Sequence, residues 1–235
     1  MNRPASPNAI HSGRRLGLRA GGGSGRDGGA GMALRRTRGF GWGAASGSGD
    51  FGLRGAMGSE RWVFGYGSLM WRPGFPFEAR SPAILYGRRR AFCIYSVHHR
   101  GTYERPGLVL GLAPGGACRG AAYRVAEADW PETYAYLMER EQPTETYIEA
   151  SRHVRLEDGR RVETLCFLSD TAHPQWAGAL SLERQAELIA GATGLSGRNV
   201  DYLRDLVAHL EELGVHDETM TRLLAMVEAG ERAAG

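Results

Sequence analysis

Residues 61–71 read Arg61-Trp-Val-Phe-Gly-Tyr-Gly-Ser-Leu-Met-Trp71, and this stretch decides how the folded part of the chain begins. Its first six residues are rich in aromatic and β-branched side chains, which predicts a buried strand. The strand runs into two glycines, which permit the tight or left-handed backbone of a turn. Successive backbone N–H groups in such a turn form a concavity suited to a carboxylate. We therefore predict a small-molecule site here, with the substrate-binding residues Val63, Phe64, Gly65, Tyr66, Gly67, Ser68 and Leu69.

Two familiar motifs nearly fit this loop, and both fail at Met70. A dinucleotide-binding fingerprint needs a third glycine at that position. A nucleophile elbow around Ser68 needs a glycine two residues later, where Met70 again stands. Ser68 is therefore expected to donate a hydrogen bond and not to act as a nucleophile. A glycine turn that serves only to reverse the chain is the alternative interpretation.

The first sixty residues differ in composition from the remainder. They hold 17 of the 35 glycines, and their nine arginines and three acidic residues give a net charge of +6. The whole chain carries +3, so the remainder carries −3. Such a segment cannot bury enough apolar surface to offset its ordering entropy. This predicts a disordered tail over residues 1–60 and a folded domain over residues 61–230.

The function of the tail has more than one interpretation. We favour an inert tail, or a start codon assigned too early, with Met57 as the true start. An Arg-rich, acid-poor segment also fits an organelle-targeting peptide or a nucleic-acid arm. Glycine richness and the lack of an amphipathic helix argue against targeting.

The overall composition indicates a globular core, and the cysteines indicate a cellular compartment. Hydrophobic residues make up 42% of the chain, and no apolar run reaches the roughly 18 residues that span a membrane, so no membrane partner is expected. The three cysteines, Cys93, Cys118 and Cys166, form no C-x-x-C pair, which disfavours a disulfide framework and a zinc site. A reduced, cytoplasmic compartment is the expectation. Histidines and carboxylates show no metal-ligand spacing, so no metal is expected.

The remaining pattern predicts an α+β fold, because strands dominate the first part and helices the end. Further strands are expected at residues 84–95, 108–112 and 120–125. Residues 152–157 and 160–168 flank Asp158-Gly159, which predicts a hairpin with a type I′ turn. Ser181 is expected to cap a helix that runs to Thr193 and ends at Gly194. Asn199 is expected to cap a helix that ends at Gly214, and a last helix covers residues 217–229.

A mid-chain helix over residues 130–140 carries the predicted catalytic group. Trp130, Tyr134 and Leu137 share one face at 3.6 residues per turn, and Glu141 lies in the centre of that apolar stripe. Burial disfavours the charged form of a carboxyl group and raises its pKa, as a general base near neutral pH requires. The alternative is that the helix ends before Glu141 and its side chain reaches water.

Two basic clusters are weaker candidates. The segment His98-His99-Arg100 follows a strand and is interpreted as a polar wall of a site, since adjacent histidines on an extended chain make a poor metal pair. Arg88 and Arg90 share one face of a strand. A solvated face is favoured there over a phosphate-binding one.

Several segments together resemble the ChaC family of γ-glutamylcyclotransferases, which act on glutathione, and specifically its bacterial branch. The resemblance extends over residues 62–228. The matching segments are Trp62-Val-Phe-Gly-Tyr-Gly-Ser-Leu-Met-Trp71, Arg89-Arg90-Ala91-Phe92, His99-Arg-Gly-Thr102 with Pro106-Gly107, Gly120-Ala-Ala-Tyr-Arg-Val125, Arg140-Glu141 with Tyr147, and Ser196-Gly-Arg-Asn199 with Tyr202-Leu203.

This resemblance implies a fold, a reaction and site residues. The fold would be the γ-glutamylcyclotransferase-like type, a small barrel-like mixed sheet with surrounding helices. The reaction would convert glutathione to 5-oxoproline and cysteinylglycine by intramolecular aminolysis, without a metal or cofactor. The family's acid/base glutamate falls on Glu141 and its substrate loop on residues 63–69. Tyr66 and Tyr147 are further candidates for substrate contacts. Glu145 is a departure from the family pattern, and we expect it to be solvated.

Two other functions stay open. A related cyclotransferase could use other γ-glutamyl peptides or amines and would share Glu141. A non-catalytic small-molecule binding module, with the Arg-rich tail on nucleic acid, is the alternative from another class. The acidic charge of the folded part argues against nucleic acid, because phosphate binding needs a basic face. The sequence does not determine the oligomeric state.

Overall fold

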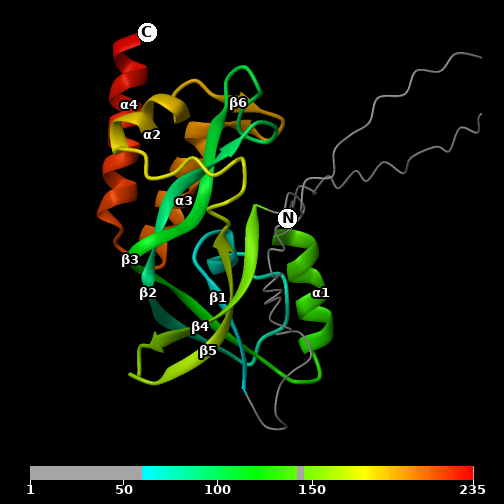
Figure 1. The fold of residues 1–235 in the computed structure, drawn as a ribbon. Coiled ribbons are helices and arrows are strands. Elements are labelled where there is room, and N and C mark those ends of the chain that lie inside the picture. The colour runs from blue at the N-terminus through cyan, green and yellow to red at the C-terminus, as the bar shows by residue number, and fades with distance from the viewer. Residues whose placement is uncertain (1–59, 142–145, 235) are drawn as a thin grey trace, which may run out of the picture. The chain divides into compact units, whose positions relative to one another are not determined.

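A computed structural model describes residues 60–141 and 146–234 of the chain. The predictions for residues 1–59, including disorder and a start at Met57, lie outside the described residues. The expectation for Glu145 lies outside them as well. The folded unit is a barrel-like sheet with helices around it, which confirms the predicted α+β architecture (Figure 1).

Five strands close the barrel in the order β1-β3-β2-β4-β5. Neighbouring strands are antiparallel except β1 and β5, which run parallel and pair Val63 with Leu165, so the sheet is mixed as predicted. The strands are β1 (Arg61–Gly65), β2 (Ala79–Ser96), β3 (Gly107–Val125), β4 (Tyr147–Leu156) and β5 (Arg161–Ser169).

The opening strand β1 is the most deeply buried part of the sheet. All five of its residues are buried, because β3 pairs with one edge of β1 and β5 with the other. A strand covered on both faces needs apolar side chains throughout, and Trp62, Val63 and Phe64 supply them. The prediction of a buried strand at the start of the domain is confirmed.

Strands β2 and β3 form one long antiparallel hairpin that extends beyond the barrel towards α2 (Leu182–Ile189) and α3 (Asn199–Glu212) (Figure 1). The prediction of two separate strands at 108–112 and 120–125 was wrong. A pair of glycines such as Gly115 and Gly116 indicates a turn in a sequence, and both have positive φ angles in the structure. They lie opposite a register shift between Tyr86 and Arg88 of β2, and β3 continues past this irregularity without a turn.

The hairpin of β4 and β5 is confirmed, but its turn differs from the predicted type I′. Gly159 N–H donates to the Leu156 carbonyl (3.0 Å), and Leu156 N–H donates to the Arg160 carbonyl (2.8 Å). The turn is therefore centred on Glu157 and Asp158, and Gly159 follows it with φ +88°. This is the three-residue hairpin loop in which glycine takes the left-handed position after the turn.

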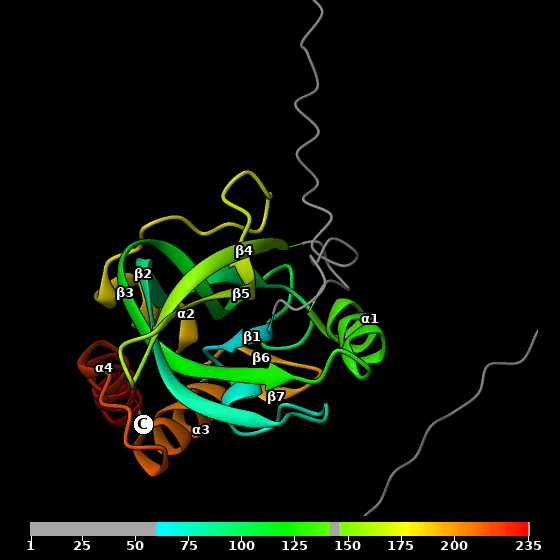
Figure 2. The ribbon, with the colours of Figure 1, turned by 90° about the horizontal axis from the view of Figure 1, so that it is seen from below.

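Helix α1 (Trp130–Glu141) lies on the opposite side of the barrel from α3 and α4 (Glu218–Ala234) (Figures 1 and 2). Ser181 caps α2 as predicted, because its Oγ accepts from Arg184 N–H at 3.2 Å. The predicted end at Gly194 was wrong. The helix stops at Ile189, Gly191 follows at φ +68°, and β6 (Thr193–Gly194) pairs with β7 (Gly197–Arg198).

Helix α3 is present and ends before Gly214 as predicted, but Asn199 does not cap it. The side chain of Asn199 is fully buried and pairs with the backbone of Leu108, accepting from its N–H and donating to its carbonyl, both at 2.7 Å. The Asn199 amide therefore links α3 to the start of β3 instead of accepting a hydrogen bond from an N–H group at the start of α3. Among the described residues, no helix is long and apolar enough to cross a membrane.

Candidate active site

Glu141 is the last residue of α1, and its side chain is 18% exposed. The buried residues of α1 are Trp130, Thr133 and Leu137, so Glu141 continues the inward face, as the helical phase predicted. Burial raises the pKa of the Glu141 carboxyl above its usual value, and the adjacent Arg140 partly offsets this effect. The alternative in which the helix ends earlier and Glu141 reaches water is not what the structure shows.

A cavity of about 360 Å³ brings Glu141 together with groups from distant parts of the chain. Tyr147 enters it from β4, Tyr202 from α3, and Arg100 from the connection between β2 and β3. His98 and His99 also line this cavity, which agrees with their interpretation as a polar wall. A half-open cavity with one largely buried carboxyl group and several tyrosine hydroxyls is a typical small-molecule site.

Three tyrosines lie within electrostatic reach of Glu141, of which Tyr66 is buried and Tyr147 and Tyr202 are partly buried. Burial, followed by the neighbouring tyrosines and Glu141, raises the pKa of Tyr66 and Tyr147 well above the ordinary value. Burial likewise raises the pKa of Tyr202 to about 12. All three hydroxyls are therefore neutral near pH 7, and that of Tyr147 donates to the Leu110 carbonyl at 2.6 Å. Each can hydrogen-bond to a substrate without adding negative charge beside Glu141.

The predicted loop lies partly in the core and partly at the surface. Val63, Phe64 and Leu69 are buried core residues, Gly65 pairs with Ala121 of β3, and Tyr66 is 7% exposed. Gly67 is half-buried and precedes the short helix η1 (Ser68–Met70), whose first residue Ser68 is exposed. The first N–H groups of a helix have no acceptor within it. This end of the loop therefore offers backbone donors, whereas Val63 and Phe64 can only support it.

The two loop glycines serve close packing. A Cβ on Gly65 would lie 2.9 Å from the Leu69 Cβ, and one on Gly67 would lie 3.1 Å from a methyl group of Leu110. Neither glycine has a positive φ angle, so the tight form of the predicted turn is the one observed. The loop folds back on itself at Gly65, and Tyr66 lies within electrostatic reach of Glu141 although it does not line the cavity.

Arg140 ties the loop to the helix that carries Glu141. Its guanidinium donates to Ser68 Oγ (2.8 Å), to the Arg72 carbonyl (2.7 Å) and to the Tyr136 hydroxyl (2.7 Å). The Nε atom of Arg140 lies 3.3 Å from Glu141 Oε1. One guanidinium thus contacts both the exposed end of the loop and the carboxyl group. Ser68 accepts this hydrogen bond, and its hydroxyl proton stays available to a ligand.

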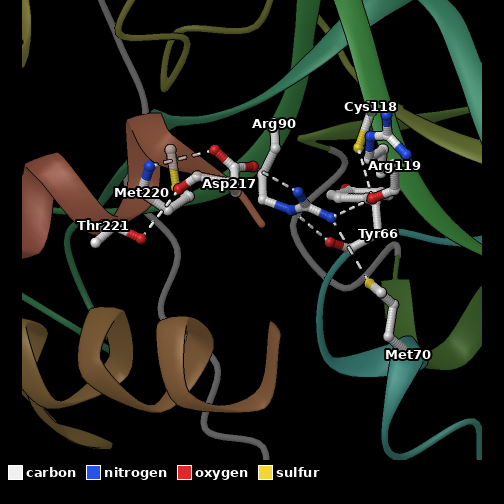
Figure 3. Close-up of polar contacts among 8 residues, drawn as sticks. All are labelled: Tyr66, Met70, Arg90, Cys118, Arg119, Asp217, Met220 and Thr221. Atoms are coloured by element: carbon white, nitrogen blue, oxygen red, sulfur yellow. Dashed lines mark hydrogen bonds and ion pairs between the residues drawn. The ribbon is translucent and has the colours of Figure 1, made fainter. Parts of the chain in front are cut away.

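A second arginine, Arg90, contacts the backbone of the loop at Tyr66, as Figure 3 shows. Arg90 donates to the Tyr66 carbonyl (2.8 Å) and to the Arg119 carbonyl (2.7 Å), and it forms an ion pair with Asp217 (2.6 Å). Asp217 in turn accepts from the N–H of Met220 at the start of α4. Arg90 is 4% exposed, so the solvated face expected for Arg88 and Arg90 was wrong for Arg90.

The predicted site residues did not include Tyr202, which lines the cavity, or Arg90, which contacts the loop. Tyr202 lies on the same face of α3 as Asn199, Leu203 and Leu206. The helical pattern of the sequence could therefore have predicted that Tyr202 faces inward. The role of Arg90 left no signal, because its partners come from three distant segments. Within the described ranges, no group of three or more His, Cys, Asp or Glu side chains is placed to hold a metal ion.

The chain is similar to known proteins along the whole described domain. The model of a family described as ChaC-like protein matches residues 61–230. A glutathione-specific gamma-glutamylcyclotransferase of Escherichia coli (strain K12) is 38% identical over 167 residues, which cover 71% of this chain and 72% of that protein. Gamma-glutamylcyclotransferase 2-3 of Arabidopsis thaliana is 33% identical over 71% of this chain and 87% of that protein.

The fold agrees with a solved structure as well. The crystal structure of a gamma-glutamyl cyclotransferase specific to glutathione from yeast superposes with a TM-score of 0.64 at 26% identity, covering 73% of this chain and 96% of that one. This agreement confirms the γ-glutamylcyclotransferase-like fold that the sequence predicted.

Proposed function

Because the chain belongs to the family of ChaC-like proteins, we propose that it is a glutathione-specific γ-glutamylcyclotransferase that converts glutathione to 5-oxoproline and cysteinylglycine. The observation that carries this proposal is Glu141, a buried carboxyl group with a raised pKa at the wall of a cavity that also holds Tyr147 and Tyr202. The similarity to glutathione-specific relatives from bacteria and yeast supports the substrate.

The reaction joins two groups of one substrate molecule. The α-amino nitrogen attacks the side-chain carbonyl carbon and forms the C–N bond of a five-membered lactam, and the C–N bond to the cysteine nitrogen breaks. Because both reacting groups belong to one molecule, the protein mainly has to hold the attacking conformer. We assign that task to the three tyrosines and the close-packed loop.

Glu141 would move the proton. As a carboxylate it accepts a proton from the substrate ammonium, and as a carboxylic acid it returns that proton to the departing cysteine nitrogen. A raised pKa suits both steps, because it makes the carboxylate a stronger base and keeps the acid form accessible near neutral pH. One carboxyl group then serves the whole cycle.

The loop would bind the γ-glutamyl end of the substrate. The free N–H groups at the start of η1 and the Ser68 hydroxyl are suited to the α-carboxylate or to the oxyanion that develops during attack. Tyr66 and Tyr147 are the proposed side-chain contacts. We assign Val63, Phe64 and Leu69 to the support of this loop, since they are buried in the core.

We place the reaction in the cytoplasm. Cys93, Cys118 and Cys166 are free and buried, and burial raises their pKa values to about 11, 11 and 12, so the thiols stay protonated and unreactive. Unpaired thiols are typical of a reducing compartment, where glutathione is abundant in its reduced form.

The test is the release of 5-oxoproline from glutathione and from γ-glutamyl-alanine, measured by mass spectrometry. We expect release from glutathione, and a loss of about 100- to 10,000-fold in kcat for Glu141→Gln with little change in glutathione binding. Glu139→Gln is the matched control, because Glu139 lies on the exposed face of the same helix. Release from γ-glutamyl-alanine alone would assign a different substrate class, and no release from either would favour a binding module.

A further inference from the structure

Arg100 is a cation of the active-site cavity, and none of the carboxylates that the structure describes forms an ion pair with it. It is half-buried and lines the same cavity as Glu141. To the described part of the chain, its guanidinium makes one hydrogen bond, from Nη1 to the Arg198 carbonyl at 3.2 Å. Among the described residues, no carboxylate lies within ion-pair distance of this guanidinium. Several of its five N–H donors are therefore available to a ligand.

The guanidinium is held in place before any ligand arrives. Its centre lies 5.1 Å from the centroid of the Tyr202 ring, over which it stacks. The backbone N–H of Arg100 donates to the buried Ser96 Oγ at 3.0 Å, and the Arg100 carbonyl approaches Gly107 so closely that a Cβ there would lie 2.1 Å from it. A stacked and anchored guanidinium loses little freedom when it binds a planar anion.

The short β6–β7 hairpin supports the same loop from outside. Leu195 N–H and Ser196 N–H donate to the carbonyls of His98 and His99, both at 2.9 Å. His99 Nδ1 also contacts Ser196 Oγ at 3.0 Å, so this imidazole is already engaged. The loop of His98, His99 and Arg100 is thus fixed by hydrogen bonds to the β6–β7 hairpin, and the Arg100 guanidinium uses only one of its N–H donors in them.

The other guanidinium of the cavity is committed elsewhere. Arg140 binds Ser68 Oγ, two backbone carbonyls and the Tyr136 hydroxyl, and its Nε faces Glu141. Tyr202 connects the two ends of the cavity, because its hydroxyl feels the charge of both Glu141 and Arg100. Glu141 and Arg100 line the same cavity of about 360 Å³, so one small ligand can contact both side chains.

We propose that Arg100 binds the C-terminal carboxylate of the peptide substrate and thereby selects γ-glutamyl peptides over γ-glutamyl amines. The inference rests on the proposed function. Glutathione carries one carboxylate at its γ-glutamyl end, which the loop takes, and a second at its glycine end. Burying that second carboxylate without a partner is costly, whereas a guanidinium can bind it through two parallel hydrogen bonds.

The experiment compares glutathione with its glycine carboxamide, which has the same shape and lacks only the terminal charge. We expect wild-type kcat/KM to be about 10- to 100-fold lower for the carboxamide, mainly through KM, as loss of a charge-assisted hydrogen bond predicts. Arg100→Gln should lower kcat/KM for glutathione by a similar factor, with a much smaller effect on the carboxamide. Arg100→Lys should retain part of the preference, because lysine keeps the charge without the fork.

Arg160→Gln is the matched control, since it removes the same charge from the exposed β4–β5 hairpin, and both substrates should keep their wild-type rates. Equal wild-type rates for the acid and the carboxamide overturn the assignment without touching the proposed function. An equal loss for both substrates in Arg100→Gln also overturns it, because that result indicates a structural role under the Tyr202 ring. A wild-type protein that releases no 5-oxoproline from either substrate overturns the function and the assignment together.

Discussion

At the scale of single residues, we expect the environment of Glu141 to set the pH range of the proposed activity. Burial raises its pKa, and the reaction begins with the carboxylate form, so kcat/KM should fall as pH drops through this raised pKa. Arg140 lowers the pKa. Arg140→Gln should therefore move the acid limb to higher pH, and Glu139→Gln should leave it in place. The check is kcat/KM for glutathione from about pH 4 to pH 8. An acid limb that stays fixed or moves to lower pH in Arg140→Gln would refute the role of Glu141.

Gly65 tests whether close packing of the loop matters for catalysis. In Gly65→Ala, the new Cβ would lie 2.9 Å from Leu69 Cβ, so η1 must shift. Overpacking of this kind costs about 1–3 kcal/mol of unfolding free energy, and we expect kcat to fall with it. Gly230→Ala is the control, because Gly230 lies in α4 with no neighbour near its Cβ position and should be stabilised by about 0.5–1 kcal/mol. Urea unfolding and 5-oxoproline release measure the two effects. A Gly65→Ala protein of wild-type stability and kcat would contradict this account.

The residues that the sequence could predict are those with a local signal. Glu141 was found because helical phase places it on the apolar face of α1, and the tight turn was found because Gly65 and Gly67 bracket Tyr66. Arg90 was misassigned because burial of an arginine depends on partners such as Tyr66 and Asp217, which are far away in sequence. Long-range pairing of this kind leaves no periodic trace.

At the scale of helices and strands, the wrong predictions also result from tertiary contacts that the sequence does not reveal. Residues 113–116 look like a turn, but pairing with β2 carries β3 through them. Asn199 looks like a helix cap, but the backbone of Leu108 offers its amide two hydrogen bonds inside the core. The strand β1 and helix α1 were predicted well, because hydrophobic pattern alone determines which of their faces is buried.

The ion pair of Arg90 and Asp217 connects the β-barrel to the start of α4, and its removal should be costly. Arg90→Met removes the positive partner of the Asp217 carboxylate and the donor to the Tyr66 carbonyl, so we expect a loss of about 3–5 kcal/mol in unfolding free energy. The double variant Arg90→Met, Asp217→Leu should recover part of this loss, because no buried charge is left unpaired. Urea unfolding of the single and double variants forms the cycle. Strictly additive losses would show that the pair is not coupled.

At the scale of the whole molecule, the barrel brings together residues that are far apart in sequence. Ser68 follows β1, Arg100 follows β2, and Glu141 ends α1. Tyr147 is the first residue of β4, and Tyr202 lies in α3. The sheet closes in the order β1-β3-β2-β4-β5, and Arg100, Glu141, Tyr147 and Tyr202 meet around one cavity, while Arg140 connects Ser68 to Glu141. The resemblance of separate short motifs to one family predicted this assembly, whereas propensity and periodicity identified only the individual elements.

The last prediction concerns the extent of the catalytic domain. Every contact assigned to the site joins residues between 60 and 234, and the family match begins at residue 61. We therefore expect a chain that starts at Met57 to keep wild-type kcat/KM for glutathione and the same thermal midpoint. A chain that starts at Phe64 is the matched control. It lacks Trp62 and Val63, which are buried in β1, and should fail to fold, because β1 pairs with both β3 and β5. Calorimetry and 5-oxoproline release distinguish the outcomes, and a clear loss of activity or stability in the Met57 chain would show that residues before it contribute to the domain.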